Sequence, residues 1–446
     1  MVWPMEAARE SVAKNHPTPH ATPGPAPHLR TPEAAKWLVR IAPPSIVRPP
    51  MEALDVTALR ADTPGVAHRV HLNNAGASLM PAPVLEAIRG HLDLEARIGG
   101  YEAAEEAAPA IADAYAEVAG LLNTTPDRIA MTEHATAAFV TALSSIRLNA
   151  GDVILTTRHD YVSNQIQYLS LSDRFGVEIV RAPDAPEGGV DVHAMEELIH
   201  RRRPRLVAVT HIPTNSGLVQ DVAAVGELCR ARDVWYLVDG CQSVGQMPIN
   251  VADIGCDFFS ATARKFLRGP RGAGFLYVSD RVLDGGLEPL FPDMRGADWI
   301  EDDLYQPAPD ARRFETWEFA WALVLGTGAA AAYARSIGLD VVRDRARAVA
   351  GTLRARLTEV PGCRVLDRGT ELGALVTASF DGHSPAELVA ELRRRGINTS
   401  SQTRIDAVLD YDQKGVDGAL RMSPHYFNDD TDLDALIGAL EEIVGS

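Results

Sequence analysis

The sequence contains little cysteine and no long apolar run. Its four cysteines in 446 residues include no C-x-x-C pair, which argues against a zinc ribbon or a disulfide scaffold and is typical of a reducing cytoplasm. No apolar run reaches the roughly 18 residues that a membrane span needs. The N-terminus also lacks the continuous apolar segment of a secretory signal. We therefore predict a cytoplasmic protein that carries no metal and does not bind a membrane.

Positive charge is also in short supply. The chain has 43 lysines and arginines but 60 acidic residues, which gives a formal net charge of −17. Proteins that grip nucleic acid or anionic membranes present a positive field to their partner. The first 50 residues also lack the periodicity of a helix-turn-helix domain. We therefore predict that nucleic acid is not a partner of this protein.

Proline is concentrated at the start of the chain. Eleven of the 29 prolines lie in residues 1–50, among scattered histidine, threonine and alanine. Such a composition buries too little apolar surface to offset the entropy lost on ordering. We therefore predict that residues 1–65 form a proline-rich, disordered N-terminal extension.

Strand and helix patterns alternate from about residue 66, which predicts an α/β fold with a mostly parallel central sheet covered on both faces. We assign residues 66–318 to this large domain and residues 319–446 to a smaller C-terminal α+β domain. The strands expected in the large domain are 152–156, 177–180, 206–210, 235–239, 258–261 and 274–278. The helices expected there include 84–98, 110–122, 192–202 and 222–232.

One lysine, Lys265, lies in a turn of small residues between two of these strands. The nearby cations Arg264, Arg268 and Arg271 are expected to lower the pKa of its amine and to favour the uncharged form. Thr262 and Arg264 offer a hydroxyl group and a cation that suit a phosphate. Taken alone, the stretch also fits a solvated lysine in a basic surface loop.

Asp239 closes another expected strand, and Gln242 follows it by three residues. A carboxylate at the carboxyl end of a parallel strand points into the crevice where α/β sheets bind ligands. There Asp239 can pair with a cationic ring nitrogen, and Gln242 can donate to a phenolate oxygen. The other role open to Asp239 is that of a helix N-cap.

A third feature is the run of small residues around Ala135 and Thr136, at a transition from strand to helix. The N–H groups and the dipole at a helix N-terminus bind phosphate. Together the three features fit pyridoxal 5′-phosphate (PLP). The lysine would bind the cofactor covalently, the aspartate would keep its pyridine nitrogen protonated, and the helix end would hold its phosphate.

The order and local sequence of these motifs resemble those of the class V aminotransferase fold family of PLP enzymes, which includes cysteine desulfurases, selenocysteine lyases and kynureninases. The resemblance covers about residues 66–446 and implies a PLP-transferase (fold type I) architecture. It makes Lys265 the catalytic lysine. Tyr161 is our candidate for stacking on the cofactor ring, with His159 as the alternative. The resemblance implies that the cofactor is bound by Ala135, Thr136, Tyr161, Asp239, Gln242, Thr262, Arg264 and Thr316.

The resemblance also implies a substrate pocket at the interface of a homodimer. Arg421 would clamp the substrate α-carboxylate, for which a bidentate guanidinium is well suited, although an ordinary salt bridge remains the alternative. Thr316 would reach the phosphate in the partner's site. The substrate contacts that it implies are Ala75, Tyr101, Asn215, Trp317 and Arg421.

The family name leaves the reaction open. Cysteine desulfurases carry a mobile cysteine in a loop before the carboxylate-binding arginine, and the corresponding stretch here, 396–406, contains none. The sequence around Gly99, Gly100 and Tyr101, together with residues 264–272, is similar to that of hercynylcysteine sulfoxide lyases. Those enzymes cut a Cβ–S bond, so we predict β-elimination of an S-substituted cysteine to a thiol or sulfenate, pyruvate and ammonia.

Other reactions need the same site. Decarboxylation-coupled deamination or transamination of a cysteine conjugate, in natural-product (lincosamide-like antibiotic) biosynthesis, is the main alternative. Cysteine desulfuration and epimerisation are minor ones. A non-catalytic descendant of the fold is a further alternative, against which the set of Asp239, Gln242, Lys265 and Arg421 argues.

Overall fold

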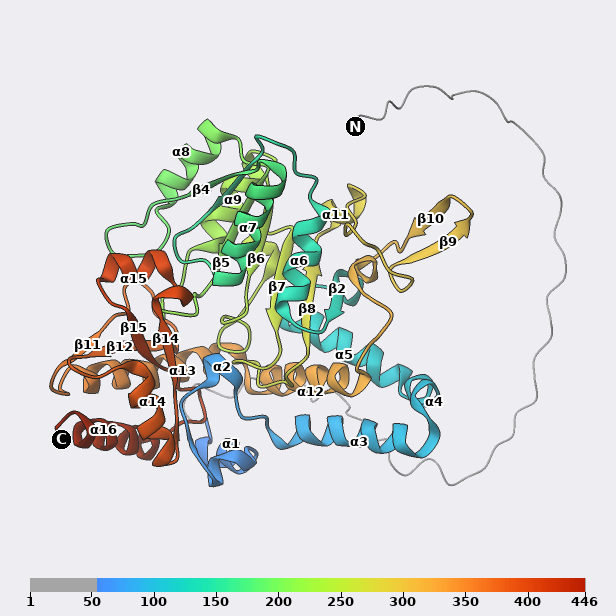
Figure 1. The fold of residues 1–446 in the computed structure, drawn as a ribbon. Helices are drawn as coiled ribbons and strands as arrows, with labels where there is room; N and C mark the ends of the chain where they lie inside the picture. Colours follow the sequence, from blue (N-terminus) through green and yellow to red (C-terminus); the bar gives the residue numbers. More distant parts are fainter. Residues whose placement is uncertain (1–53, 446) are drawn as a thin grey trace, which may run out of the picture. The chain divides into compact units, whose positions relative to one another are not determined.

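A seven-stranded sheet lies at the centre of the computed structural model, which describes residues 54–445 (Figure 1). Its strand order is β2-β8-β7-β6-β5-β3-β4. The five strands from β7 to β4 are parallel, whereas β8 runs antiparallel to both β7 and β2. This confirms the predicted mostly parallel sheet. Its strands are β2 (Ile129–Thr132), β3 (Val153–Thr156), β4 (Glu178–Arg181), β5 (Leu206–Thr210), β6 (Trp235–Asp239), β7 (Phe258–Thr262) and β8 (Gly274–Val278).

Helices cover both faces of this sheet because consecutive strand residues point to opposite sides. Leu237 packs with residues of α6 and α7 on one face, and its neighbour Val238 packs with residues of α5, α8, α9 and α12 on the other. Both side chains are fully buried. The helices of this part are α3 (Ala82–Ile98), α4 (Gly100–Glu106), α5 (Ala108–Leu121), α6 (Ala135–Ser145), α7 (Val162–Phe175), α8 (Val192–Arg202), α9 (Val222–Ala231), α10 (Val251–Ile254), α11 (Asp280–Asp284) and α12 (Trp321–Ile337), with short 3₁₀ turns η3 (Pro126–Arg128) and η4 (Ala311–Phe314).

A second, four-stranded sheet lies in the C-terminal part, with the antiparallel order β11-β12-β15-β14. It shares an apolar core with α13, α14 and α16. This sheet lies within the predicted small domain, residues 319–446, but α12 at the start of that range packs in the core of the large sheet. The elements are α13 (Leu339–Leu357), β11 (Cys363–Val365), β12 (Val376–Phe380), α14 (Pro385–Arg394), β13 (Ile397–Asn398), β14 (Ser400–Thr403), η5 (Arg404–Asp406), α15 (Val408–Lys414), β15 (Gly418–Met422) and α16 (Asp430–Val444).

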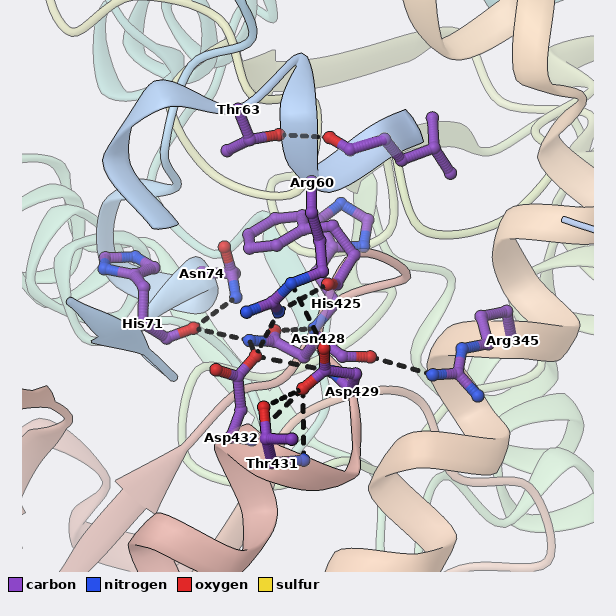
Figure 2. Close-up of polar contacts among 12 residues, drawn as sticks. Arg60, Thr63, His71, Asn74, Arg345, His425, Asn428, Asp429, Thr431 and Asp432 are labelled. Atoms are coloured by element: carbon purple, nitrogen blue, oxygen red, sulfur yellow. Dashed lines mark hydrogen bonds and ion pairs between the residues drawn. The ribbon is translucent and has the colours of Figure 1, made fainter. Parts of the chain in front are cut away.

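The N-terminal extension is shorter than we expected from the sequence. Residues 1–53 lie outside the described residues, but residues 54–65, which we predicted to be disordered, include helix α1 (Val56–Ala61). Arg60 of this helix forms ion pairs with Asp429 at 3.1 Å and with Asp432 at 2.7 Å, at the start of α16 (Figure 2). The prediction was wrong for this segment because these partners lie more than 360 residues away along the chain.

The arm that follows α1 is held to the same C-terminal segment. Asn428 donates to the carbonyl oxygen of His71 at 3.2 Å and to Asp432 at 2.8 Å, and Arg345 of α13 donates to the carbonyl oxygen of Asn428 (Figure 2). The two-residue strand β1 (Val70–His71) pairs in parallel with β13. The remaining arm elements are η2 (Pro64–Ala67) and α2 (Asn74–Ala77).

A hairpin of β9 (Ala297–Glu301) and β10 (Leu304–Pro307) projects away from the central sheet (Figure 1). Its large apolar side chains are open to solvent, Trp299 at 79% and Tyr305 at 46%. In residues 54–445 no single helix is both long and apolar enough to cross a membrane, and only the pair α12 and α13, bent by 82°, reaches that length and composition together.

Candidate active site

A cavity of about 370 Å³ opens at the carboxyl ends of three parallel strands. Thr210, Asp239 and Thr262 are the last residues of β5, β6 and β7, and all three line it. Thr210 lies directly opposite Asp239 in the register of the sheet. This edge is where open α/β sheets bind ligands.

The N-terminus of α6 forms another wall of the cavity. Ala135 and Thr136 of its first turn line the cavity, as do His134 before them and Arg264 from the loop after β7. His134 caps the helix, since its Nδ1 accepts a hydrogen bond from the backbone of Ala137 at 3.0 Å. A helix N-terminus next to a guanidinium is a favourable place for a phosphate.

Lys265 projects into the same cavity, and only 7% of its surface is exposed. Burial is the main cause that lowers the pKa of its amine, and the cations Arg264 and Arg421 act in the same direction. Asp239 and Cys241 oppose them. The Lys265 Nζ lies 5.9 Å from the centre of the Tyr161 ring, which also lines the cavity.

The direction of this shift and the contribution of Arg264 were predicted from the sequence, but its main cause, burial, was not. Arg268 is buried and turned away from Lys265, because its guanidinium donates to Tyr426 at 2.5 Å and to Thr63 at 2.6 Å. Arg271 lines the cavity without being among the causes that act on the Lys265 pKa. Loss of hydration, which favours the uncharged amine, has the largest effect instead.

Asp239 and Gln242 line the cavity together with Lys265. Asp239 is 4% exposed, and its Oδ1 accepts from the backbone N–H of Cys241 at 2.9 Å. Gln242 donates through Nε2 to the carbonyl oxygen of Ala75 at 3.2 Å and to the hydroxyl of Thr214 at 3.3 Å. Asp239 is therefore not a helix cap but a buried carboxylate at the cavity wall.

The residues of the cavity fit PLP. A helix N-terminus with Arg264 suits its phosphate, Asp239 suits a protonated ring nitrogen, and Lys265 supplies an amine for its aldehyde. Two buried polar atoms, Gln242 Oε1 and Arg421 Nε, have no hydrogen-bond partner within residues 54–445. Because buried polar groups are rarely left unpaired, these atoms are suited to a polar ligand.

Three residues that we predicted to bind substrate lie behind this wall. Arg421 is buried and donates to the hydroxyl of Thr214, a residue that lines the cavity, at 2.8 Å. Asn215 donates to Asp410 of α15 at 2.6 Å, so its amide is engaged away from the cavity. Ala75 is buried and contributes its carbonyl oxygen to Gln242.

The structure does not bring three other predicted residues to the cavity of their own chain. Tyr101 on α4 is 77% exposed, and Trp317 is 46% exposed. The hydroxyl of Thr316 lies 3.4 Å from Glu133, next to the cavity residue His134. A role for Thr316 in the site of a partner subunit stays a prediction.

Several cavity residues were not predicted from the sequence. Thr210 is marked by the same signal as Asp239, a polar side chain at the end of a buried strand, and that signal was available. Ile212, Thr214 and Cys241 have no such signal, because their places depend on how loops fold back. The alternative stacking residue, His159, forms ion pairs with Asp184 at 3.3 Å and Asp410 at 3.6 Å, whereas Tyr161 lines the cavity.

Known proteins resemble this chain over most of its length. The model of the family described as aminotransferase class-V matches residues 70–436. A protein of Methanothermobacter thermautotrophicus named "Probable cysteine desulfurase" is 29% identical over 394 residues, which cover 87% of this chain and 98% of the relative. The apo cysteine desulfurase of Thermococcus onnurineus and the cysteine desulfurase CsdA of Escherichia coli each have a TM-score of 0.80 and 24% identity. Those structures cover 87% and 88% of this chain, and 98% and 99% of their own chains.

Proposed function

The chain belongs to the aminotransferase class-V family of PLP-dependent enzymes, and on this basis we propose that it cleaves the Cβ–S bond of an S-substituted cysteine by β-elimination. The Cα–H and Cβ–S bonds break, and the sulfur leaves with the electrons of the Cβ–S bond as a thiolate or sulfenate. Water then completes the conversion of the remaining carbon skeleton to pyruvate and ammonium. No oxidant or reductant is consumed.

The observation that carries this proposal is the lack of a cysteine in the segment that pairs with the strand of Arg421. Ser400 lies directly opposite Arg421, because β14 and β15 are antiparallel neighbours. The stretch 396–406 contains strands and a 3₁₀ turn but no cysteine. A persulfide relay needs a thiol that reaches the substrate sulfur, so this arrangement favours elimination.

The four cysteines support the same conclusion. Cys229 and Cys256 are buried in the apolar core on one face of the central sheet. Burial raises the pKa of the Cys363 thiol to about 12, and it raises the pKa of the Cys241 thiol further. Cys241 lines the cavity, but a thiol whose pKa is raised is a poor nucleophile near neutral pH.

The site residues predicted from the sequence have separate tasks in this reaction. The amine of Lys265 removes the α-proton, for which it has to be uncharged, and burial favours that form. PLP, when bound, withdraws the electron pair that the α-proton leaves behind. Asp239 would hold the ring nitrogen of the bound cofactor, Tyr161 would stack on its ring, and Ala135, Thr136, Thr262 and Arg264 would hold its phosphate. Arg421, which donates to the cavity residue Thr214, would orient the substrate carboxylate.

The test compares L-cysteine and S-methyl-L-cysteine as substrates of the purified, PLP-loaded protein. We expect pyruvate and ammonia in equal amounts from the S-substituted cysteine, and no alanine from L-cysteine. Release of carbon dioxide, or an amino-acid product without pyruvate, would contradict elimination.

Cysteine desulfurase is the second candidate, because the curated relatives carry that name. It predicts alanine from L-cysteine and sulfur held on the protein. The Cys241→Ser variant tests it directly, because Cys241 is the cysteine that lines the cavity. Alanine formation that disappears in this variant would favour desulfuration over elimination.

A further inference from the structure

One asparagine joins two buried carboxylates next to the cavity. Asn164, in the first turn of α7, is 2% exposed. Its Nδ2 lies 3.2 Å from Oδ2 of Asp239 and 3.0 Å from Oδ1 of Asp160. An amide nitrogen carries two hydrogens, so Asn164 can donate one to each carboxylate at once.

Both oxygens of Asp239 thus accept a hydrogen bond from the protein, and the second donor, Asn164, lies outside the cavity lining. Oδ1 accepts from the backbone of Cys241, and Oδ2 accepts from Asn164. A carboxylate with only one fixed oxygen can rotate about its χ2 angle, since that rotation is soft. The second donor therefore sets the plane in which the remaining lone pairs of Asp239 face the cavity.

Asp160 holds Asn164 in turn. It accepts from the hydroxyl of Thr156 at 2.8 Å, from the hydroxyl of Thr210 at 2.6 Å and from the backbone of Tyr161 at 2.7 Å. Those donors come from the ends of β3 and β5 and the start of α7. The carboxylate of Asp160 therefore binds both Tyr161, the residue proposed to stack on the cofactor ring, and Asn164, which donates to Asp239.

We propose that Asn164 and Asp160 are positioning residues that fix the carboxylate of Asp239 for its contact with the cofactor's ring nitrogen. This inference rests on the role proposed above for Asp239. Asn164 does not touch the cavity and acts through Asp239. Its amide also separates two buried acidic side chains that would otherwise repel each other.

Electrostatics agree with this arrangement. Burial raises the pKa of Asp160 and Asp239 adds to that rise, while hydrogen bonds from Thr210, Asn164 and Thr156 lower it. Asp239 is also within electrostatic reach of Tyr168, Cys241 and Lys265. A change of charge at position 164 is therefore expected to be felt by the titrating groups of the cavity.

The test uses Asn164→Asp, which keeps the shape of the side chain but replaces the donor with a negative charge. Losing a hydrogen bond to a charged group weakens binding roughly ten- to a hundredfold. We therefore expect the Kd of PLP for the apoprotein to rise by about that factor. We also expect a higher midpoint pH for the pH-dependent change in the cofactor's visible absorption. The added negative charge favours the protonated form of the cofactor's ring nitrogen.

Matched variants separate positioning from a merely structural effect. Ser170→Asp adds the same charge on an exposed part of the same helix and is expected to change neither the Kd nor the midpoint pH. Asn164→Ala removes the donor without adding charge, so it is expected to raise the Kd with a smaller shift of the midpoint. Thermal unfolding of the apoproteins shows whether each variant folds, and Asn164→Ala carries the test if Asn164→Asp does not.

The inference is overturned if both Asn164 variants bind PLP as tightly as the wild type with an unchanged midpoint pH. Asp239→Asn, measured alongside, separates this outcome from failure of the proposed role of Asp239. If Asp239→Asn changes neither quantity, that role itself is wrong. If it changes both while the Asn164 variants change neither, only the positioning inference fails.

Discussion

At the scale of single residues, Lys265 is the side chain on which the proposed chemistry depends. Its ammonium form would lose most of its hydration inside the cavity, and this loss lowers the pKa of the amine from its ordinary value of 10.5. Arg264 and Arg421 lower it further, whereas Asp239 acts against them. Near neutral pH a larger share of Lys265 is therefore uncharged than for a lysine in water.

This environment predicts how the rate depends on pH. Pyruvate release is expected to rise with pH as the Lys265 amine loses its proton, with a midpoint below 10.5. Arg264→Gln removes a cation that lowers this pKa, so its midpoint is expected to lie at higher pH than that of the wild type. The measurement is kcat/KM against pH for both proteins. A midpoint unchanged by Arg264→Gln would contradict the electrostatic account.

Replacing Lys265 gives the matching loss of function. Lys265→Ala removes the proton-accepting amine, and general base catalysis contributes roughly 10²–10⁴-fold to a rate. We expect at least this decrease in pyruvate release, measured after saturation with PLP. Full turnover in Lys265→Ala would rule out the proposed role of this residue.

The cavity residues predicted from the sequence share a local signal. Asp239 and Thr262 end buried strands, and Ala135 and Thr136 begin a helix after a strand, so the fold pattern alone places them at one sheet edge. Asn164 has no such signal, since its contact with Asp239 joins residues 75 positions apart. That contact depends on the packing of α7, which periodicity does not specify.

At the scale of secondary structure, helix α1 shows why short elements escape sequence patterns. Six residues are too few for a helix to be stable alone, and α1 has no buried residue to mark an apolar face. Its side-chain contacts come from distant parts of the chain. Arg60 pairs with acidic residues at the start of α16 (Figure 2), and Leu59 packs against the cluster of Val342, Tyr426 and Phe427. The long strands β5, β6 and β8, by contrast, were predicted with their exact bounds because their apolar runs are continuous.

The ion pairs of Arg60 give a testable contribution to stability. Arg60→Ala leaves Asp432, whose side chain is 6% exposed, without its cation. We expect the free energy of unfolding to fall by about 1–2 kcal/mol, because a hydrogen bond to a charged and mostly buried group is lost. Arg201→Ala is the control, since its pair with Glu197 is solvent-exposed and worth at most about 0.5 kcal/mol. Equal losses in urea unfolding would contradict a special role for α1.

At the scale of the whole molecule, the β9–β10 hairpin exposes apolar surface that soluble monomers rarely leave open. Trp299, Ile300, Leu304 and Tyr305 are each more than 40% exposed. The hairpin leads through η4 to Thr316, near the rim of the cavity. The prediction that Thr316 reaches the phosphate in a partner's site requires a second copy of the chain to bind near Thr316.

We therefore predict a homodimer. Light scattering is expected to give about twice the chain mass of 48.1 kDa. The double variant Trp299→Asp and Tyr305→Asp is expected to be monomeric and to bind PLP more weakly. Phe175→Asp is the control, since Phe175 is 52% exposed but precedes β4 at the other edge of the sheet. A wild-type monomer with full activity would contradict a shared site.

The parallel pairing of β1 with β13 has a consequence for the order of folding. The contact between His71 and Asn398 joins residues 327 positions apart, although the arm emerges early during synthesis and β13 among the last segments. Domains generally fold as they leave the ribosome, N-terminal parts first. The arm therefore cannot pair with β13 until that strand has been made. A nascent chain, or one truncated before β13, can build the central sheet while the arm that contacts Gln242 and Arg264 of the cavity has no strand to pair with.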